Sequence, residues 1–431
     1  MIQALLGCVN IRAGETFRVT VMASLLFLLL AANNLIKILR DSIFLGRHSV
    51  SELPYLYILV AVVAGAIIAT YTKYTARLSL TRLMLATNAI ILSNIVFFWL
   101  ILTHFDTDWS HYAFYIWSAI ASVIAVAQLW TLANQIFTAE EAGRSLGFLA
   151  AGGTAGGVAA AFAVKWSLHL TVESNHLLWC VAGLYLAASA LVFWAAPRLK
   201  GERGEKSLDR LDKPQENNTN SIGALLTGSR YLKTIAVLIL VSVIVSTLID
   251  FQLKASAKEI YPSREALAGF FSSYYGWLSI ATLFAQVLLT GRTLNKFGLN
   301  SSLYLTPAAL LTGALALMIQ PTLLTAALTR MADATLRNSI HRSSMEMIYM
   351  PLPGNVKKTI KTFLDVVVER FGDAAAGFVI LLFSLSLVKR YVTYVHFVCV
   401  ALILVWIALI RFIRIGDSEN LSDGFPQQSS E

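Results

Sequence analysis

The stretch KGERGEKSLDRLDKPQENNTNS, residues 200–221, decides the fold because it divides the chain into two similar halves. It is polar and has no apolar periodicity, which is typical of a linker. On each side of it lie six apolar runs of about 20 residues, the length that a helix needs to cross ~30 Å of hydrocarbon. Transmembrane barrels show short alternating segments instead. We therefore predict an all-α integral membrane protein with twelve transmembrane helices in two six-helix halves.

The predicted spans follow one another at short intervals within each half. Those of the first half are residues 18–38, 53–74, 82–103, 112–134, 146–168 and 177–197. Those of the second half are residues 233–253, 267–290, 302–319, 321–348, 362–388 and 391–413. The predicted divisions of the chain are an N-terminal half (1–197), a cytoplasmic linker (198–231), a C-terminal half (232–414) and a disordered cytoplasmic tail (415–431).

The composition agrees with a membrane protein. Of the 431 residues 57% are hydrophobic and 14% are charged, and the mean hydropathy is +0.66. The three cysteines, Cys8, Cys180 and Cys399, lie far apart, so neither a disulfide framework nor a CxxC metal motif is predicted. The net charge is +9. In membrane proteins such an excess collects in cytoplasmic loops, so we do not expect nucleic acid as a partner.

The distribution of lysine and arginine predicts the orientation. If the N-terminus is cytoplasmic and twelve spans alternate, twenty-one of these residues fall in inner segments and seven in outer segments. Such a bias follows the positive-inside rule. Both termini and the linker are therefore predicted to be cytoplasmic.

The two halves also repeat one another in order. Each opens with a span that ends in charges, LIKILRD at 35–41 and LIDFQLKASAKE at 248–259, and continues with a span that ends in a basic turn. Two six-helix halves joined by a cytoplasmic linker resemble the architecture of the major facilitator superfamily. In that architecture the halves rock about a site near the middle of the membrane.

The tenth predicted span is unusually charged. It lies within PTLLTAALTRMADATLRNSIHRSSMEMIYM, residues 321–350. A charge at the centre of a bilayer costs roughly 2.5–3.5 kcal/mol, so a helix without a function would not retain several. Its charged and titratable residues are Arg330, Asp333, Arg337, His341, Arg342 and Glu346. The first four follow an i, i+3, i+7, i+11 spacing, which places them on one face. This face is predicted to line a pathway for a charged solute.

The first and seventh spans carry corresponding charges. In the first, we predict that Lys37 pairs with Asp41 while Arg40 stays free to bind an anion. The alternative is that these basic side chains only snorkel to the outer interface. In the seventh, Asp250 and Lys254 are predicted to pair at i, i+4. Together the two sets would form an outer gate, or they would simply face external water.

The eleventh span carries Asp365, Glu369 and Asp373 on one face and Arg370 on a neighbouring face. Three carboxylates in a low dielectric need cations or protons. The basic face of the tenth span is their expected partner, either as part of a site or as mutual neutralisation. Proton coupling is a further possibility. For His341 a hydrogen bond is expected in preference to a proton relay.

Two further segments of the first half have polar or small residues. Asn134 and Gln135, near the end of the fourth span, would bond a solute or another helix. Glu140 and Arg144 are spaced for a helical ion pair. The sequence AAGGTAGGVAA, residues 150–160, repeats small residues four apart and predicts close helix packing, since the lysine of a phosphate-binding loop is absent.

No catalytic motif is found in the sequence. HExxH, GxSxG and GxxxxGK are all absent, and we find no metal-binding spacing. We therefore expect neither an enzyme nor a resident cofactor or metal.

At this point the chain resembles the ATP/ADP translocases of plastids and intracellular bacteria and their bacterial relatives. The segments that carry the resemblance are LIKILRDSIF (35–44), LWTLANQIFTAEEAGRSLGF (129–148), DFQLKASAKEIYPSREALAGFFSSYY (250–275) and TLRNSIHRSSMEMIYMPLPGNVKKTIKTFLDVVVERFGD (335–373). The resemblance implies that membrane-embedded charges bind nucleotide phosphates. The positions that match the family's patterns are Lys37, Arg40, Asp41, Asn134, Gln135, Glu141 and Arg144. Because this chain looks like a shortened, divergent member, exchange of ATP for ADP is only what the resemblance implies.

The predicted function is secondary transport of an anionic nucleotide or related phosphate metabolite across a bacterial inner membrane, by a monomer, through alternating access. The predicted substrate-binding residues are Lys37, Arg40, Asn134, Arg330, Arg337 and Arg370. The predicted charge-pairing or proton-coupling residues are Asp41, Asp250, Asp333, Glu369 and Asp373. The alternatives are a proton-coupled carrier of another small molecule and a non-transporting membrane sensor or anchor.

Overall fold

The computed structural model describes residues 15–75, 80–137, 139–170, 174–201, 229–286, 290–349, 360–361, 363–385 and 391–412. All regular secondary structure in these ranges is helical, as predicted. The helices match the twelve predicted spans, with the tenth and eleventh each built from more than one segment. Most of the predicted linker and all of the predicted tail lie outside the described residues.

The chain forms two compact units, and each draws on both sequence halves. Unit 1 comprises residues 1–49, 66–214 and 257–284, and unit 2 comprises residues 50–65, 215–256 and 285–431. Helix α3 (Leu53–Thr75) is therefore shared, and α10 (Arg264–Phe284) belongs to unit 1 although it follows the linker. The predicted domain boundaries, which follow the two sequence halves, stay a prediction.

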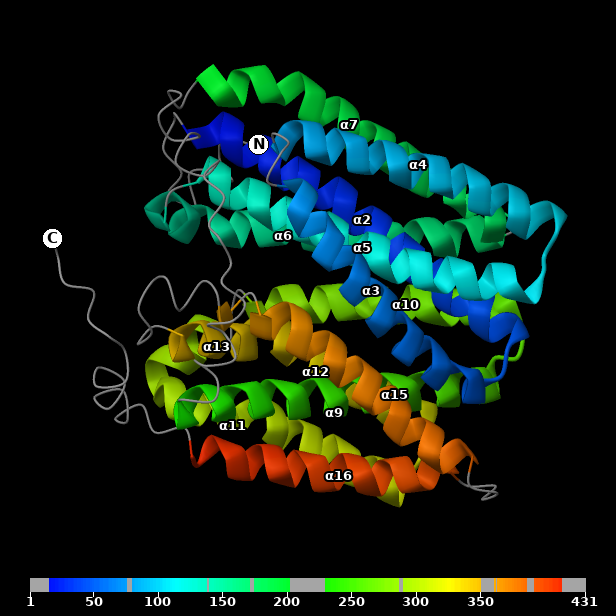
Figure 1. The fold of residues 1–431 in the computed structure, drawn as a ribbon, viewed down its shortest axis with the longest axis vertical. Coiled ribbons are helices and arrows are strands. Elements are labelled where there is room, and N and C mark those ends of the chain that lie inside the picture. The colour runs from blue at the N-terminus through cyan, green and yellow to red at the C-terminus, as the bar shows by residue number, and fades with distance from the viewer. Residues whose placement is uncertain are drawn as a thin grey trace, which may run out of the picture. The chain divides into compact units, whose positions relative to one another are not determined.

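Unit 1 is built around one long central helix. Its helices are α2 (Thr16–Arg47), α4 (Leu80–His104), α5 (Asp108–Ile136), α6 (Ala139–His169), α7 (Leu177–Gly201) and α10, with a short 3₁₀ turn η3 (Ser174–His176). α2 packs against α5, α6, α7 and α10 (Figure 1). Of its most apolar window 67% is buried, against 33–50% for the other spans of the first half. Polar residues on α2 are consequently shielded by protein.

Glycines let α6 approach α2 closely, as the small-residue repeat predicts. A Cβ atom added at Gly152 would lie 2.8 Å from the carbonyl oxygen of Ala23, and one added at Gly156 would lie 2.1 Å from that of Phe27. Both obstacles are backbone atoms, which cannot move aside as a flexible side chain can. The packing of these two helices therefore requires the absence of side chains here.

Unit 2 contains the tenth and eleventh spans, with the charged residues predicted there. Its elements are the N-terminal part of α3, the short turn η2 (Val50–Glu52), α9 (Arg230–Ile260) as far as Ser256, α11 (Thr290–Ile319), α12 (Leu323–Leu336), η6 (Arg337–His341), α13 (Arg342–Ile348), η7 (Leu364–Val368), α15 (Glu369–Leu385) and α16 (Tyr391–Ile410). α11 packs against α12 and α16 (Figure 1). α9, the first span of the second half, has 67% of its apolar window buried, as α2 has in unit 1.

Two π-helical turns interrupt the charged spans. The tenth span begins with a capping box between Thr322 and Thr325, runs through α12, and turns π-helical at η6 before it continues as α13. The eleventh begins its described course with the π turn η7 and continues as α15. Such turns are rare and occur frequently at functional sites. Arg337 is the first residue of η6, and Glu369 directly follows η7.

Eight helices in the described residues are long and apolar enough to cross a membrane by length and composition. The helices that fall short include α12 and α15, which carry the charges. Backbone groups in lipid must be satisfied within the segment, and helices meet that requirement. The described fold is therefore a bundle of helices, eight of which could cross a membrane.

Candidate functional site

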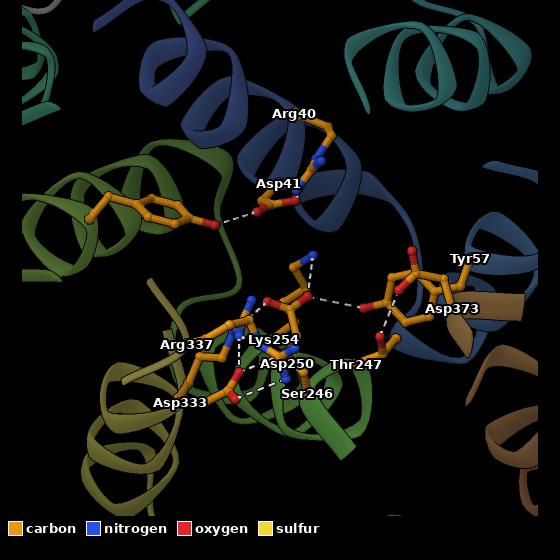
Figure 2. Close-up of polar contacts among 12 residues, drawn as sticks. Arg40, Asp41, Tyr57, Ser246, Thr247, Asp250, Lys254, Asp333, Arg337 and Asp373 are labelled. Atoms are coloured by element: carbon orange, nitrogen blue, oxygen red, sulfur yellow. Dashed lines mark hydrogen bonds and ion pairs between the residues drawn. The ribbon is translucent and has the colours of Figure 1, made fainter. Parts of the chain in front are cut away.

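The main polar cluster of unit 2 joins α9 to α12 (Figure 2). α9 contributes Ser246, Asp250 and Lys254, and α12 contributes Arg330 and Asp333. In each helix these residues are three or four apart, which places them on one face. The face-forming periodicity predicted for the tenth span is thus confirmed for Arg330 and Asp333, whose side chains meet.

Asp250 accepts bonds from three side chains. Lys254 Nζ lies 2.8 Å from its Oδ2, and Arg330 Nε lies 3.1 Å from its Oδ1. The hydroxyl of Tyr57, on α3, donates to Oδ2 at 3.4 Å. The predicted pair of Asp250 with Lys254 is confirmed. Because Lys254 is buried, with 2% of its side chain exposed, this carboxylate is what makes its charge tolerable in the bundle.

Asp333 is fully buried and is shared by two guanidinium groups. Its Oδ2 bonds with Arg330 Nη1 and accepts a 2.6 Å hydrogen bond from Ser246 Oγ. Its Oδ1 lies 3.3 Å from Arg337 Nη2. Such charge-assisted bonds compensate the removal of the carboxylate from water. Asp333 thus orients both arginines.

Arg337 is the least satisfied cation of this cluster. Its Nη2 donates to the carbonyl oxygen of Ser242 at 2.8 Å and shares Asp333 with Arg330. Its Nε is buried and has no hydrogen-bond partner among the residues that the structure describes. A buried donor without a partner costs roughly 1–3 kcal/mol. The side chain is nevertheless 25% exposed, so part of the guanidinium can be reached.

In the ion pairs of this cluster, the cations outnumber the carboxylates. Within the described part of the chain, three cations share two carboxylates; the cations are Lys254, Arg330 and Arg337, and the carboxylates are Asp250 and Asp333. Cations that must share a carboxylate within a membrane bundle favour a further anionic partner. The guanidinium fork suits phosphate and carboxylate oxygens in particular.

The acidic face of α15 is neutralised locally. Arg370 Nη1 lies 3.0 Å from Asp373 Oδ2, and its Nη2 lies 3.9 Å from Glu369 Oε2. Thr247 of α9 donates to Asp373 Oδ1 at 2.9 Å. Arg370, predicted on a neighbouring face, therefore shares the face of Asp373 because the two are three apart. The side chain of Asp365 lies outside the described residues.

His341 is buried next to an aromatic ring. It lies in η6, and its ring centroid is 5.6 Å from that of Trp406, in an edge-to-face arrangement. Nδ1 has no hydrogen-bond partner in the described structure. The geometry thus provides an aromatic contact, and a hydrogen bond of Nε2 stays a prediction.

In unit 1, the charges of α2 pair differently from the prediction. Arg40 Nε lies 2.9 Å from Asp41 Oδ1, so Arg40 is not the free anion clamp that was predicted. Tyr275 donates to Asp41 Oδ2 at 3.1 Å, and the Arg40 guanidinium lies 4.6 Å from the centroid of the Tyr115 ring. Helical spacing alone could not reveal this, because a long arginine side chain can fold back onto its sequence neighbour. Lys37 is half-buried one turn earlier, and its pairing with Asp41 stays a prediction.

The remaining predicted residues of unit 1 are described only in part. Asn134 lies in α5, but its side chain and those of Gln135, Glu140 and Arg144 are outside the described residues. Glu141 is described: its Oε1 lies 3.0 Å from Nη2 of Arg18 on α2. That bond ties α2 to the start of α6, and only the opposite charges of the two residues pointed to it in the sequence.

Sequence analysis missed four hydroxyl groups that donate to the aspartates of the two units. Tyr57, Ser246, Thr247 and Tyr275 each donate to a buried or half-buried aspartate. Only Ser246 and Thr247 left a usable signal, since they lie three or four residues before Asp250 on the same helix. The two tyrosines come from other helices, and their proximity depends on tertiary packing.

The fold defines the class of the protein. Along 91% of this chain and 97% of the other, it resembles the crystal structure of the nucleoside transporter NupG, with a TM-score of 0.63 and 12% identity. At that identity the likeness shows the fold alone. It confirms the predicted architecture: a helical membrane bundle of the major facilitator type.

The family follows from the sequence comparison. Residues 94–415 match the model of the TLC ATP/ADP transporter family, and because this is most of the chain, the chain belongs to that family. An ADP,ATP carrier protein 2 of Chlamydia pneumoniae is 24% identical over 354 residues, which cover 71% of this chain and 65% of that protein. The chloroplastic ADP,ATP carrier protein 1 of Arabidopsis thaliana is 22% identical, over 71% of this chain and 54% of that protein. The matched regions thus cover less than two thirds of the length of each of these two relatives. Both relatives are named as carriers.

Proposed function

We propose that this chain is a secondary transporter that moves an anionic nucleotide, or a related phosphate metabolite, by alternating access. The fold and the family support a carrier, and the relatives that it resembles are named ADP,ATP carriers. The site supports an anionic solute, because guanidinium groups persist within the bundle where idle charge is unfavourable.

The observation that carries the proposal is the state of Arg337. It shares its carboxylate partner with a second arginine, retains a buried Nε–H without a partner in the described structure, and is one quarter exposed. A phosphate oxygen would accept a hydrogen bond from this donor. We assign Arg337 and Arg330 to phosphate binding and Asp333 to holding them in place.

Other predicted residues enter the proposal with less direct roles. Lys37 and Arg370 are proposed as further contacts for the anion, and Asn134 as a hydrogen-bond partner of its polar edge. The paired Arg40 is proposed to join them only if its bond to Asp41 opens. Glu369 and Asp373 are proposed to keep Arg370 oriented.

For the setting of the protein, we propose a bacterial inner membrane, a monomer, and cytoplasmic termini and linker. The bias of lysine and arginine toward one set of segments supports this orientation. We propose no resident cofactor, no enzymatic activity and no nucleic-acid partner, since the carrier mechanism requires none of them.

Uptake by reconstituted protein tests the proposal. Proteoliposomes that contain the wild-type chain should accumulate labelled ATP or ADP above empty liposomes. Arg337→Ala and Lys37→Ala should lower uptake at least tenfold, which corresponds to about 1.4 kcal/mol of lost interaction. Arg411→Ala is the matched control, because this arginine is exposed at the end of α16.

The coupling mode is decided in the same preparation. Faster uptake into vesicles preloaded with nucleotide would identify exchange, whereas uptake driven by a pH gradient would identify a proton-coupled carrier. No uptake of any nucleotide by correctly folded wild-type protein would overturn the proposed substrate class.

A further inference from the structure

A second polar cluster lies in unit 1, where α2 ends and α5 begins. His48 follows the last residue of α2, and His111 lies in the first turn of α5. Both rings are buried, and His48 Nε2 lies 3.1 Å from His111 Nδ1. Phe44 stacks on the His48 ring with centroids 4.7 Å apart, which fixes its orientation.

Two aspartates and an arginine surround these rings. Asp106 Oδ1 lies 2.8 Å from His111 Nε2, on the side of the ring away from His48. Arg47 bonds Asp106 Oδ2 at 2.7 Å and Asp108 Oδ1 at 3.1 Å. One carboxylate oxygen of Asp108 and one nitrogen of each histidine lie within 4.8 Å of one another. The backbone of Asp106 adopts a positive φ of 32°, which is uncommon for an aspartate and turns the chain at this point.

This arrangement has the features of a transition-metal site. Two ligands on one tetrahedral zinc ion, each at 2.0–2.1 Å, are separated by about 3.3 Å, close to the distance between the facing nitrogens. A metal-bound histidine commonly donates its other N–H to a carboxylate, which is the bond that His111 makes with Asp106.

The proton count permits binding without a change in net protonation. The Asp106 carboxylate accepts from Nε2 of a neutral His111, so His111 Nδ1 presents a lone pair, and the proton between the rings belongs to His48 Nε2. When His48 carries its proton on Nδ1 instead, both facing nitrogens present lone pairs. A divalent cation bound to both would lie beside the line that joins them, because half of their 3.1 Å separation is too short for a zinc–nitrogen bond.

We propose that His48, His111 and Asp108 bind one zinc ion, or a similar divalent transition metal, with Asp106 as the outer partner of His111. Imidazole ligands select such metals over calcium and magnesium. The fourth ligand position is open to water. Bound metal would tie the end of α2 to the start of α5. No spacing motif predicted this site, because His48 is distant in sequence and the remaining pattern, DxDxxH at 106–111, is short.

Metal binding by the purified full-length chain tests the site. The chain should carry a tag without histidines and should be stripped with a chelator. Titration calorimetry with zinc chloride should give one site per chain, and zinc should raise the apparent melting temperature by mass action. X-ray absorption should show two imidazole nitrogens and oxygen at about 2.0–2.2 Å from the metal.

Three variants of proposed ligands and one control variant separate metal binding from other effects. His111→Gln and His48→Gln should abolish the calorimetric site, and Asp108→Asn, at an exposed position, should weaken zinc binding at least tenfold without loss of folding. His104→Gln, which alters a histidine outside the cluster, should bind as the wild type does. Wild-type protein that binds no zinc would overturn the assignment. So would an Asp108→Asn variant with unchanged affinity and an unchanged absorption spectrum.

Discussion

Units 1 and 2 each bury aspartates beside arginines on their charged spans, but the two sets are completed differently. In unit 1, Asp41 pairs with the adjacent Arg40, and aromatic side chains cover the rest: Tyr275 bonds the carboxylate, and Tyr115 lies under the guanidinium. In unit 2, three cations share the carboxylates of Asp250 and Asp333, and Arg337 Nε has no hydrogen-bond partner among the described residues. The comparison teaches that buried charge alone does not mark a binding site. The position with an unmet hydrogen bond is the better candidate.

The largest effect is expected for Asp333→Ala. This substitution leaves two guanidinium groups without their shared carboxylate inside the bundle. Removing one partner of a buried ion pair costs roughly 3–5 kcal/mol, so the melting temperature in detergent should fall steeply. Asn338→Ala, at an exposed position of η6, is the control and should change little. A mild effect of Asp333→Ala would show that the cluster is not held by this carboxylate.

A smaller loss is expected for Asp41→Ala in unit 1. The change removes two charge-assisted bonds, but Arg40 keeps the face of Tyr115 and is 14% exposed, so its charge is not fully stranded. We expect about 1.5–3 kcal/mol, measured as the shift of the unfolding midpoint. Equal destabilisation by Asp41→Ala and Asp333→Ala would remove the contrast between the two units.

The packing of unit 1 is tested by Gly156→Ala. The new methyl group would meet the carbonyl oxygen of Phe27, so α6 must move away from α2. Overpacking of this kind costs about 1–3 kcal/mol. Gly183→Ala is a matched control, since nothing lies within 4 Å of its added Cβ. Thermal unfolding of both proteins should separate them clearly, and identical midpoints would contradict the close contact.

The smallest effect is expected for Tyr57→Phe. The hydroxyl bond to Asp250 is long, at 3.4 Å, and Asp250 keeps Lys254 and Arg330 as partners. The ring also remains, with Lys254 Nζ 5.7 Å from its centroid. The loss should be about 0.5–1.5 kcal/mol, read from the same unfolding curves. A loss as large as that of Asp333→Ala would mean that Tyr57 organises the cluster.

The sequence predicted most of the fold because membrane helices can be recognised by their length and hydropathy. It also predicted pairs within one helix, such as Asp250 with Lys254, and the glycine contact of α6, since both depend on a period of about four residues. It failed where a side chain had a choice of partners, as with Arg40. It also gave no means of finding partners that only tertiary packing brings together, such as His48 with His111 or Arg18 with Glu141.

The central claim is that Arg337 in unit 2 offers its unmet donor to an anionic nucleotide. Its most direct test is the binding of ADP to the purified protein, measured by calorimetry for the wild type, Arg337→Gln and Arg411→Gln. We predict that the wild type and Arg411→Gln bind with the same affinity and that Arg337→Gln binds at least tenfold more weakly. Folded Arg337→Gln protein that binds ADP as tightly as the wild type would contradict the claim.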